Sequence, residues 1–129
     1  LAGCDITQIT ALRKHWPAHK KTLSISCHHG DELEQAHRLG ADYAMLSPVF
    51  PTLSHPGAAP LGIATFESLC AATALPVVAL GGISTQNCNA LQSHPLAVIG
   101  AILDADDPFS AAQHLRRAAS KNNAKESAL

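Results

Sequence analysis

Short apolar runs with the character of buried β-strands alternate along this chain with segments of helical periodicity. The β-type runs lie at residues 22–26, 42–46, 76–80 and 96–99. Helical spacing of apolar residues follows at 31–39, 63–70, 84–91 and from 108 onward, and one more amphipathic segment precedes the first run at 6–16. Repeated strand–helix units of this kind predict a four-stranded parallel α/β sheet. Periodicity alone leaves two architectures open, an open doubly wound sheet and half of a (β/α)8 barrel.

Several helix ends are marked by residues that favour them. Gly40 follows the segment at 31–39 and suits the position just past a helix. Asp107 and Pro108 supply an N-cap acid and a first-turn proline for the last helix. Ser84 is placed to cap the short helix before residue 91. We expect one partial-barrel domain over residues 1–119 and a flexible polar tail over 120–129.

Composition and charge exclude several classes of partner. The 129 residues are 47% hydrophobic and 15% charged, which favours a folded domain over disorder. A formal charge of −1 provides no field that attracts nucleic acid or an anionic membrane. We find no apolar run of the roughly 18 residues needed to span a bilayer and no signal-peptide pattern, so we expect a cytoplasmic protein. Because residue 1 is Leu, we expect a piece of a longer chain.

The four cysteines and eight histidines do not form a recognisable metal motif. No C-x-x-C pair and no H-E-x-x-H sequence occurs. We expect reduced thiols packed as small apolar groups. A metal cluster assembled from distant histidines stays open as the less favoured alternative.

The strongest local signal for a binding site is Gly81-Gly82 at the end of the third apolar run. Two glycines there let backbone N–H groups approach an anion, and the turn capped by Ser84 points its positive end to the same place. Ile99 and Gly100 end the next run, and the last two strands of a (β/α)8 barrel often share a phosphate site. We therefore favour phosphate binding at these residues over a plain tight turn.

Two further segments carry polar side chains at strand ends. Ser26 and His28 alternate in extended backbone, so both face the same side, and an imidazole can serve as acid or base near neutral pH. The long loop from 49 to 61 carries Thr52, Ser54 and His55, which can all donate to phosphate oxygens. The alternatives are a core or capping imidazole at His28 and a solvated turn at the loop.

These segments together resemble the thiamine phosphate synthase/TenI family. The matching segments are S-I-S-C-H at 24–28, G-A-D-Y at 40–43, S-P-V-F-P-T at 47–52, L-G at 61–62, P-V-V-A-L-G-G-I at 76–83 and A-D-D-P at 105–108. They follow the family's order over about residues 20 to 118. Since the family fold is a complete TIM barrel, the resemblance implies that this chain is its C-terminal half. The stretch at 54–62 looks closest to TenI-like modules fused behind a Nudix hydrolase.

The resemblance implies a function and roles for named residues. The family joins hydroxymethylpyrimidine diphosphate to a thiazole phosphate with Mg2+ and releases pyrophosphate. Pyrophosphate would contact Ser26, Thr52, Ser54 and His55, and the thiazole phosphate would be held by Gly81, Gly82, Ile99 and Gly100. His28 and Ser26 would be the catalytic residues, His28 through proton transfer as in the TenI tautomerases.

Two departures from the family pattern keep alternative functions open. His55 replaces the lysine of the family's loop, so a fixed positive charge becomes a conditional one. The family's Mg2+-binding acids belong to the N-terminal half of the barrel, and Asp5 is the one possible match here. The alternatives are a TenI-like thiazole tautomerase and a non-catalytic phosphate-binding module of a Nudix fusion. The expected partners are the two small-molecule substrates, the missing N-terminal half-barrel and a fused Nudix domain.

Overall fold

The computed structural model describes residues 6–16, 21–54, 56–91 and 93–120. Helices and strands alternate over residues 6–79, as the sequence predicts. The elements are α1 (Ile6–His15), β1 (Ser24–Cys27), α2 (Gly30–Arg38), β2 (Tyr43–Leu46), α3 (Gly62–Ala72), β3 (Val77–Ala79), the 3-10 helix η1 (Cys88–Leu91), α4 (Gly100–Leu103) and α5 (Pro108–Ser120). The expected tail at 120–129 lies outside the described residues, except for Ser120, which ends α5.

The sheet is parallel, with the strands in the order β1-β2-β3. The prediction of four full strands is wrong for the last one. The run at 96–99 forms a single parallel bridge, from Leu96 to Ala79, with hydrogen bonds from Ala79 N to Pro95 O and from Ala97 N to Ala79 O. Within the described chain no further strand pairs with the outer side of this run, and α4 begins shortly after it, at Gly100.

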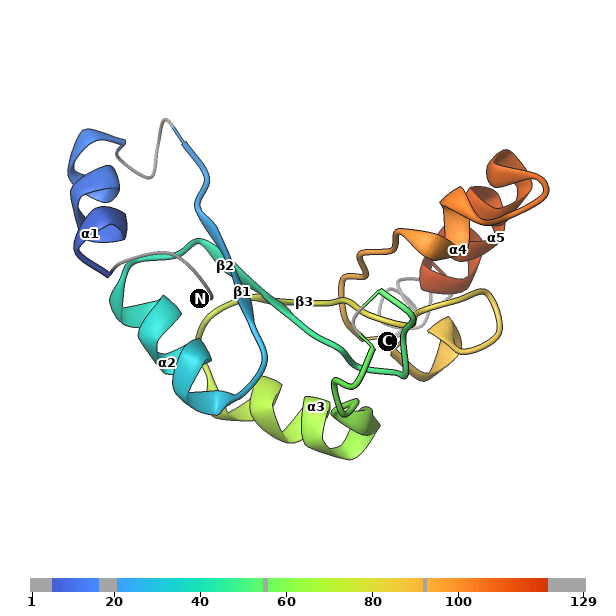
Figure 1. Cartoon of the computed structure of the whole chain (residues 1–129), viewed down its shortest axis with the longest axis horizontal. Helices are drawn as coiled ribbons and strands as arrows, with labels where there is room; N and C mark the ends of the chain where they lie inside the picture. The colour runs from blue at the N-terminus through green and yellow to red at the C-terminus, as the bar shows by residue number, and fades with distance from the viewer. Residues whose placement is uncertain (1–5, 17–20, 55, 92, 121–129) are drawn as a thin grey trace, which may run out of the picture.

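The two faces of the sheet differ in burial because helices cover only one of them. Residues on the helix side are buried, including Ile25, Cys27, Ala44, Leu46 and Ala79. Ser24 and Ser26 on the opposite face of β1 are exposed, and their neighbours in β2 are half-buried. Figure 1 shows α1 and α2 to the left of the strands, α3 below them, and α4 and α5 on the right. The fold is a partial (β/α) barrel whose inner face is open.

The core lies between the sheet and its covering helices. Phe66 of α3 is the largest fully buried side chain, and Leu33 of α2 is buried to 2% exposure. Truncating a buried phenylalanine of this kind costs about 3–5 kcal/mol. Ile99, which the sequence suggested as part of a buried strand, is 60% exposed because no described strand continues the sheet beyond it.

Two of the predicted helix ends are confirmed. At the end of α2, Gly40 has φ 74°, its N–H donates to His37 O and the Ala41 N–H donates to Ala36 O, which is a Schellman motif. At the start of α5, the Asp107 carboxylate accepts from the backbone N–H groups of Phe109 and Ser110. The hydrogen bond from the Ser110 hydroxyl, followed by those from the backbone N–H groups of Ser110 and Phe109, lowers the pKa of Asp107.

An ion pair fastens α1 to the amino-terminal end of β2. The Arg13 guanidinium lies 2.8 Å from Asp42 Oδ2, and the same oxygen accepts a hydrogen bond from Leu23 N at 2.7 Å. The backbone hydrogen bond from Leu23 and the side-chain hydrogen bond from Arg13 lower the pKa of Asp42. This end of the sheet is opposite to the ends where barrels of this class carry their sites, so the pair serves stability.

None of the described helices has the length and apolar character that a bilayer crossing requires.

Candidate functional site

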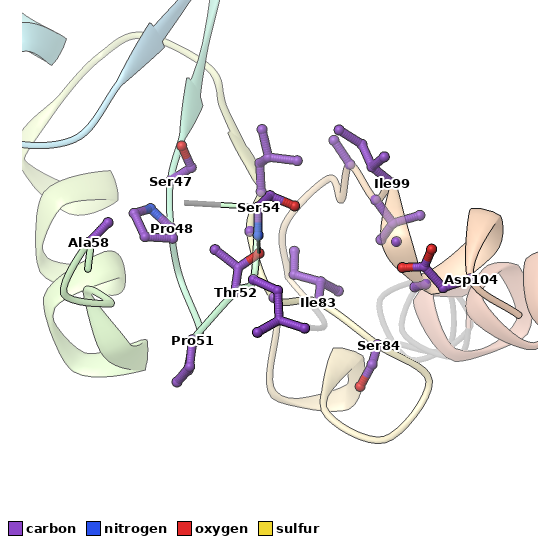
Figure 2. A pocket seen from close by; sticks show the side chains of 18 of the residues that line it. Ser47, Pro48, Pro51, Thr52, Ser54, Ala58, Ile83, Ser84, Ile99 and Asp104 are labelled. Carbon is purple, nitrogen blue, oxygen red and sulfur yellow. Dashed lines mark hydrogen bonds between the residues drawn. The ribbon is translucent and has the colours of Figure 1, made fainter. Parts of the chain in front are cut away.

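The carboxyl ends of the strands surround one cavity of about 450 Å3, which is within the range of small-molecule sites. It is lined by residues 28, 47–48, 51–54, 58, 80–84, 97–101 and 104. Figure 2 shows contributions from the segment after β2 and the loop following it, from the turn after β3 and from the start of α4. The position fits the rule that parallel α/β folds bind ligands at the carboxyl edge of the sheet.

His28 extends from the end of β1 and is held by the segment after β2. Its Nδ1 atom lies 2.8 Å from the carbonyl oxygen of Ser47. A carbonyl only accepts, so Nδ1 is the donor in this contact, and the neutral ring keeps the lone pair on Nε2. The backbone N–H of His28 donates to Glu32 Oε2 at 2.6 Å, which anchors the start of α2 to the same residue.

The hydrogen bond from the His28 backbone lowers the pKa of Glu32. Burial would raise the pKa of Glu32, but the hydrogen bond from the His28 backbone and the neighbouring imidazoles of His29 and His28 outweigh it, and the pKa is lowered. The carboxylate is therefore an acceptor at neutral pH and supports the backbone of His28 rather than a catalytic proton transfer.

Gly81 and Gly82 form a turn that presses against the loop after β2. Their φ values are 94° and 66°, both in the region that favours glycine. A Cβ on Gly81 would lie 2.7 Å from Pro48 Cα, and one on Gly82 would collide with the carbonyl oxygens of Phe50 and Pro51. The N–H groups of Val49 and Phe50 donate to Leu80 O and Gly81 O. Packing therefore requires both glycines, independently of any ligand.

Asn87, which sequence reasoning missed, fixes the shape of this turn. Its Nδ2 donates to Gly82 O at 2.9 Å, and its Oδ1 accepts from Ser84 N at 2.8 Å. The Ser84 hydroxyl accepts from Gln86 N at 3.2 Å, so Ser84 and Asn87 cap the turn reciprocally. In Figure 2 the Ser84 hydroxyl points away from the cavity. The signal was present in the sequence, since a polar residue three positions after a capping serine is the spacing of a capping box.

The loop after β2 brings Thr52 and Ser54 to the cavity, where Figure 2 shows them side by side. The Thr52 hydroxyl accepts a hydrogen bond from Ser54 N at 3.2 Å. Leu53 between them also lines the cavity and is 97% exposed. Two hydroxyl groups at the mouth of an otherwise largely apolar cavity can donate to an anionic ligand.

The turn at 81–84 and the segment at 97–101 line the same cavity. Both contribute main-chain groups, and Ile83 and Val98 contribute apolar surface. The two small-residue strand ends therefore lie at one cavity.

Comparison with known proteins identifies the family. The TMP-TENI family model, described as thiamine monophosphate synthase, matches residues 4–103. The chain belongs to the thiamine monophosphate synthase family. It is 37% identical over 100 residues to a thiamine-phosphate synthase of Chloroflexus aurantiacus, covering 74% of this chain and 46% of that one. It is 40% identical over 99 residues to one of Desulfitobacterium hafniense, covering 74% and 48%.

Solved structures support the same family and fold. A thiamine phosphate pyrophosphorylase from Pyrococcus furiosus superposes with a TM-score of 0.74 at 25% identity, over 88% of this chain and 55% of that one. A 3-hexulose-6-phosphate synthase from Salmonella typhimurium superposes with a TM-score of 0.70 at 16% identity, over 91% and 58%, and shows the fold alone. The chain spans about half the length of the thiamine-phosphate synthases it matches.

Not every residue that we expected in a synthase site lies at the cavity. His28, Thr52, Ser54, Gly81, Gly82, Ile99 and Gly100 line it. Ser26 does not line the cavity. It lies on the exposed face of β1, two residues before His28 and farther from the carboxyl end of the strand. His55 and Asp5 lie outside the described residues.

The described lining of the cavity carries little charge. Among the described residues that line the cavity, none is Lys or Arg, and Asp104 is the one acidic side chain. The described chain also brings together no group of three or more His, Cys, Asp or Glu side chains. These residues do not form a Mg2+ site by themselves.

Cys27 and Cys70 are poor candidates for a nucleophile. Burial, with a smaller effect of Glu32, raises the pKa of Cys27 to about 11, and burial, with Glu67, raises that of Cys70 to about 11. Both thiols therefore stay protonated at neutral pH. Cys27, Cys70 and Cys88 form no disulfide among the described residues.

Proposed function

We propose that this chain supplies the phosphate-binding half of a thiamine phosphate synthase-type active site. The full-length protein would join hydroxymethylpyrimidine diphosphate to a thiazole phosphate and release pyrophosphate. The observation that carries the proposal is the shared cavity at the ends of β3 and of the segment at 95–97. Membership of the thiamine monophosphate synthase family supports the same reaction.

The thiazole phosphate would bind between the two turns. Backbone N–H groups near Gly81, Gly82, Ile99 and Gly100 would donate to its oxygens. Ile83 and Val98, which line the cavity beside these turns, would pack against the thiazole ring. Such binding is dominated by main-chain donors, because the described lining contains no Lys or Arg.

The pyrimidine diphosphate would bind on the side of the long loop. Thr52 and Ser54 would donate to its terminal phosphate, together with His55 when protonated. Ser26 would contribute from the inner face of β1, where the remaining half of the barrel would close over it. Mg2+, when bound, would neutralise the departing pyrophosphate, and its ligands would come largely from outside the described residues, since these do not fit a complete site.

One observation favours a second function, that of a TenI-like thiazole tautomerase. The contact from His28 Nδ1 to Ser47 O leaves Nε2 of the neutral ring as a proton acceptor at the edge of the cavity. Tautomerisation requires proton transfer by such a group. It does not require a cation beside a leaving pyrophosphate, so the replacement of the family's loop lysine by His55 is less costly for this reaction.

A third function, a phosphate-binding module without turnover in a Nudix fusion, uses the same cavity. For each function we propose that residues 1–119 form one partial-barrel domain completed by an N-terminal half-barrel, in a cytoplasmic protein.

Complementation of a thiamine-requiring strain lacking its own synthase tests the proposal. The full-length chain should restore growth, and the purified protein should form thiamine phosphate from the two substrates. Failure of both, with the protein folded and abundant, would exclude the synthase. A thiazole isomerisation assay on the same protein would then separate the tautomerase from the module.

A further inference from the structure

Asp104 places a negative charge beside the proposed phosphate site. It ends α4, and its side chain folds back over the first residue of that helix. A methyl group built on Gly100 would lie 2.8 Å from Asp104 Oδ2. Figure 2 shows the carboxyl group turned toward the Ile99 side of the cavity. The backbone holds it there, because Asp104 N donates to Gly100 O at 2.9 Å.

Nothing in the described chain neutralises this carboxylate. The ion pairs of the described residues join Arg13 to Asp42, His29 to Glu32, Arg38 to Glu34 and His94 to Glu67, and none involves Asp104. The lining offers no Lys or Arg to offset it either. An anion bound by the main chain at Gly100 would therefore lie near a like charge that no described cation pairs with.

We propose that Asp104 is a specificity-determining residue that opposes the binding of phosphate dianions in this cavity. The inference rests on the proposed phosphate site. The cavity would bind phosphate monoesters, but it would favour those of lower negative charge, since a monoanion is repelled half as strongly as a dianion.

Asp106 offers a matched control. It is exposed, carries the same charge, lies two residues further along the chain and does not line the cavity. The substitutions Asp104→Asn and Asp106→Asn change net charge equally. A general effect of charge on anion binding would thus appear in both variants, and a local effect only in the first.

The test is calorimetric titration of the full-length protein in EDTA, with thiazole phosphate and with its dephosphorylated alcohol as ligands. Asp104→Asn should tighten binding of the phosphate by about 3- to 10-fold near neutral pH. Its affinity for the alcohol should not change. Asp106→Asn should bind both ligands as the wild type does. The gain should shrink at high salt, because the interaction is partly exposed.

Other outcomes overturn the inference in different ways. Unchanged or weaker phosphate binding by Asp104→Asn, with the wild type binding normally, rejects the role of Asp104 and leaves the proposed function intact. Equal tightening of phosphate binding in both variants would show that the effect comes from the net charge of the protein and not from the position of Asp104. Absence of phosphate binding in folded wild type and both variants rejects the phosphate site itself, and the inference with it.

Discussion

The imidazole of His28 and the backbone carbonyl of Ser47 lie 2.8 Å apart, from Nδ1 to the oxygen. This contact joins the end of β1 to the segment after β2 and orients the ring at the edge of the cavity. It also selects the neutral tautomer in which Nε2 is the acceptor. A histidine with a purely structural role would need only the hydrogen bond that joins the two segments. A substitution that keeps this hydrogen bond but removes the titratable nitrogen can therefore separate the structural role from proton transfer.

Replacing His28 with Asn should lower turnover while sparing ligand affinity. The Asn amide can still donate to Ser47 O, but it provides no titratable nitrogen. We expect kcat for the thiazole phosphate reaction to fall by about 100-fold or more, with thiazole phosphate affinity within about 3-fold of the wild type. Steady-state kinetics and titration check this. His29→Asn, next to it but not lining the cavity, is the control, and equal losses in both variants would contradict a role for His28 in proton transfer.

Gly81→Ala should destabilise the fold more than Gly57→Ala. The two glycines have similar φ values, 94° and 89°, so both substitutions carry a conformational cost of about 1–3 kcal/mol. A Cβ on Gly81 also meets Pro48 Cα at 2.7 Å, while one on Gly57 meets nothing within 4 Å. Overpacking should add about 1–3 kcal/mol at Gly81. Urea unfolding measures both, and equal losses would mean that the loop moves freely away from the turn.

Asn87→Ala should lower the free energy of unfolding by about 1–3 kcal/mol, because it leaves Ser84 N and Gly82 O without their partner. The turn at 81–84 should loosen, so affinity for inorganic phosphate should fall as well. Asn89→Ala, at an exposed position on η1, should stay within about 0.5 kcal/mol. A stable Asn87→Ala variant with unchanged phosphate affinity would show that the turn needs no side-chain support.

Sequence patterns predicted the alternation of elements and several helix ends, because those depend on local chemistry. Gly40 and Asp107 act within one helical turn of their own positions. The fourth strand could not be predicted in this way, because strand pairing depends on residues far apart in the sequence. Leu96 pairs with Ala79 of β3 through a single bridge, and α4 begins a few residues later at Gly100.

The cavity was predictable only in part. Glycines at two consecutive strand ends indicated where it lies, since parallel strands end at one edge of the sheet. Asp104 was not predicted, because its effect depends on a four-residue helix that turns its side chain back over Gly100. The partner of His28 was equally hidden, because it is a backbone carbonyl and any residue at position 47 would supply one.

Acid should weaken the fold partly through Asp42. Its pKa is lowered in the folded state by Leu23 N and Arg13, so between the folded and unfolded pKa values the unfolded chain binds more protons. The stabilisation is complete above the unfolded value of about 3.9 and is lost as pH falls through the folded one. The unfolding free energy of wild type minus that of Asp42→Asn should be equal at pH 7 and 5 and should shrink below pH 4. Asp106→Asn is the control, and a difference that stays constant to pH 3 would contradict the assignment.

The 129-residue chain alone should not behave as a stable monomer. In the described structure the outer edge of β1 and the outer side of the segment at 95–97 are unpaired. The inner face of the sheet is also uncovered, since Ser24 and Ser26 on that face are exposed. Open edges of a parallel sheet seek partners, so the midpoint of thermal unfolding should rise with protein concentration and sedimentation should show self-association. Adding the N-terminal half-barrel of a homologous synthase should remove both effects, because it would pair the two edges. A sharp transition independent of concentration, in a monomer, would mean that these edges are satisfied within the chain itself.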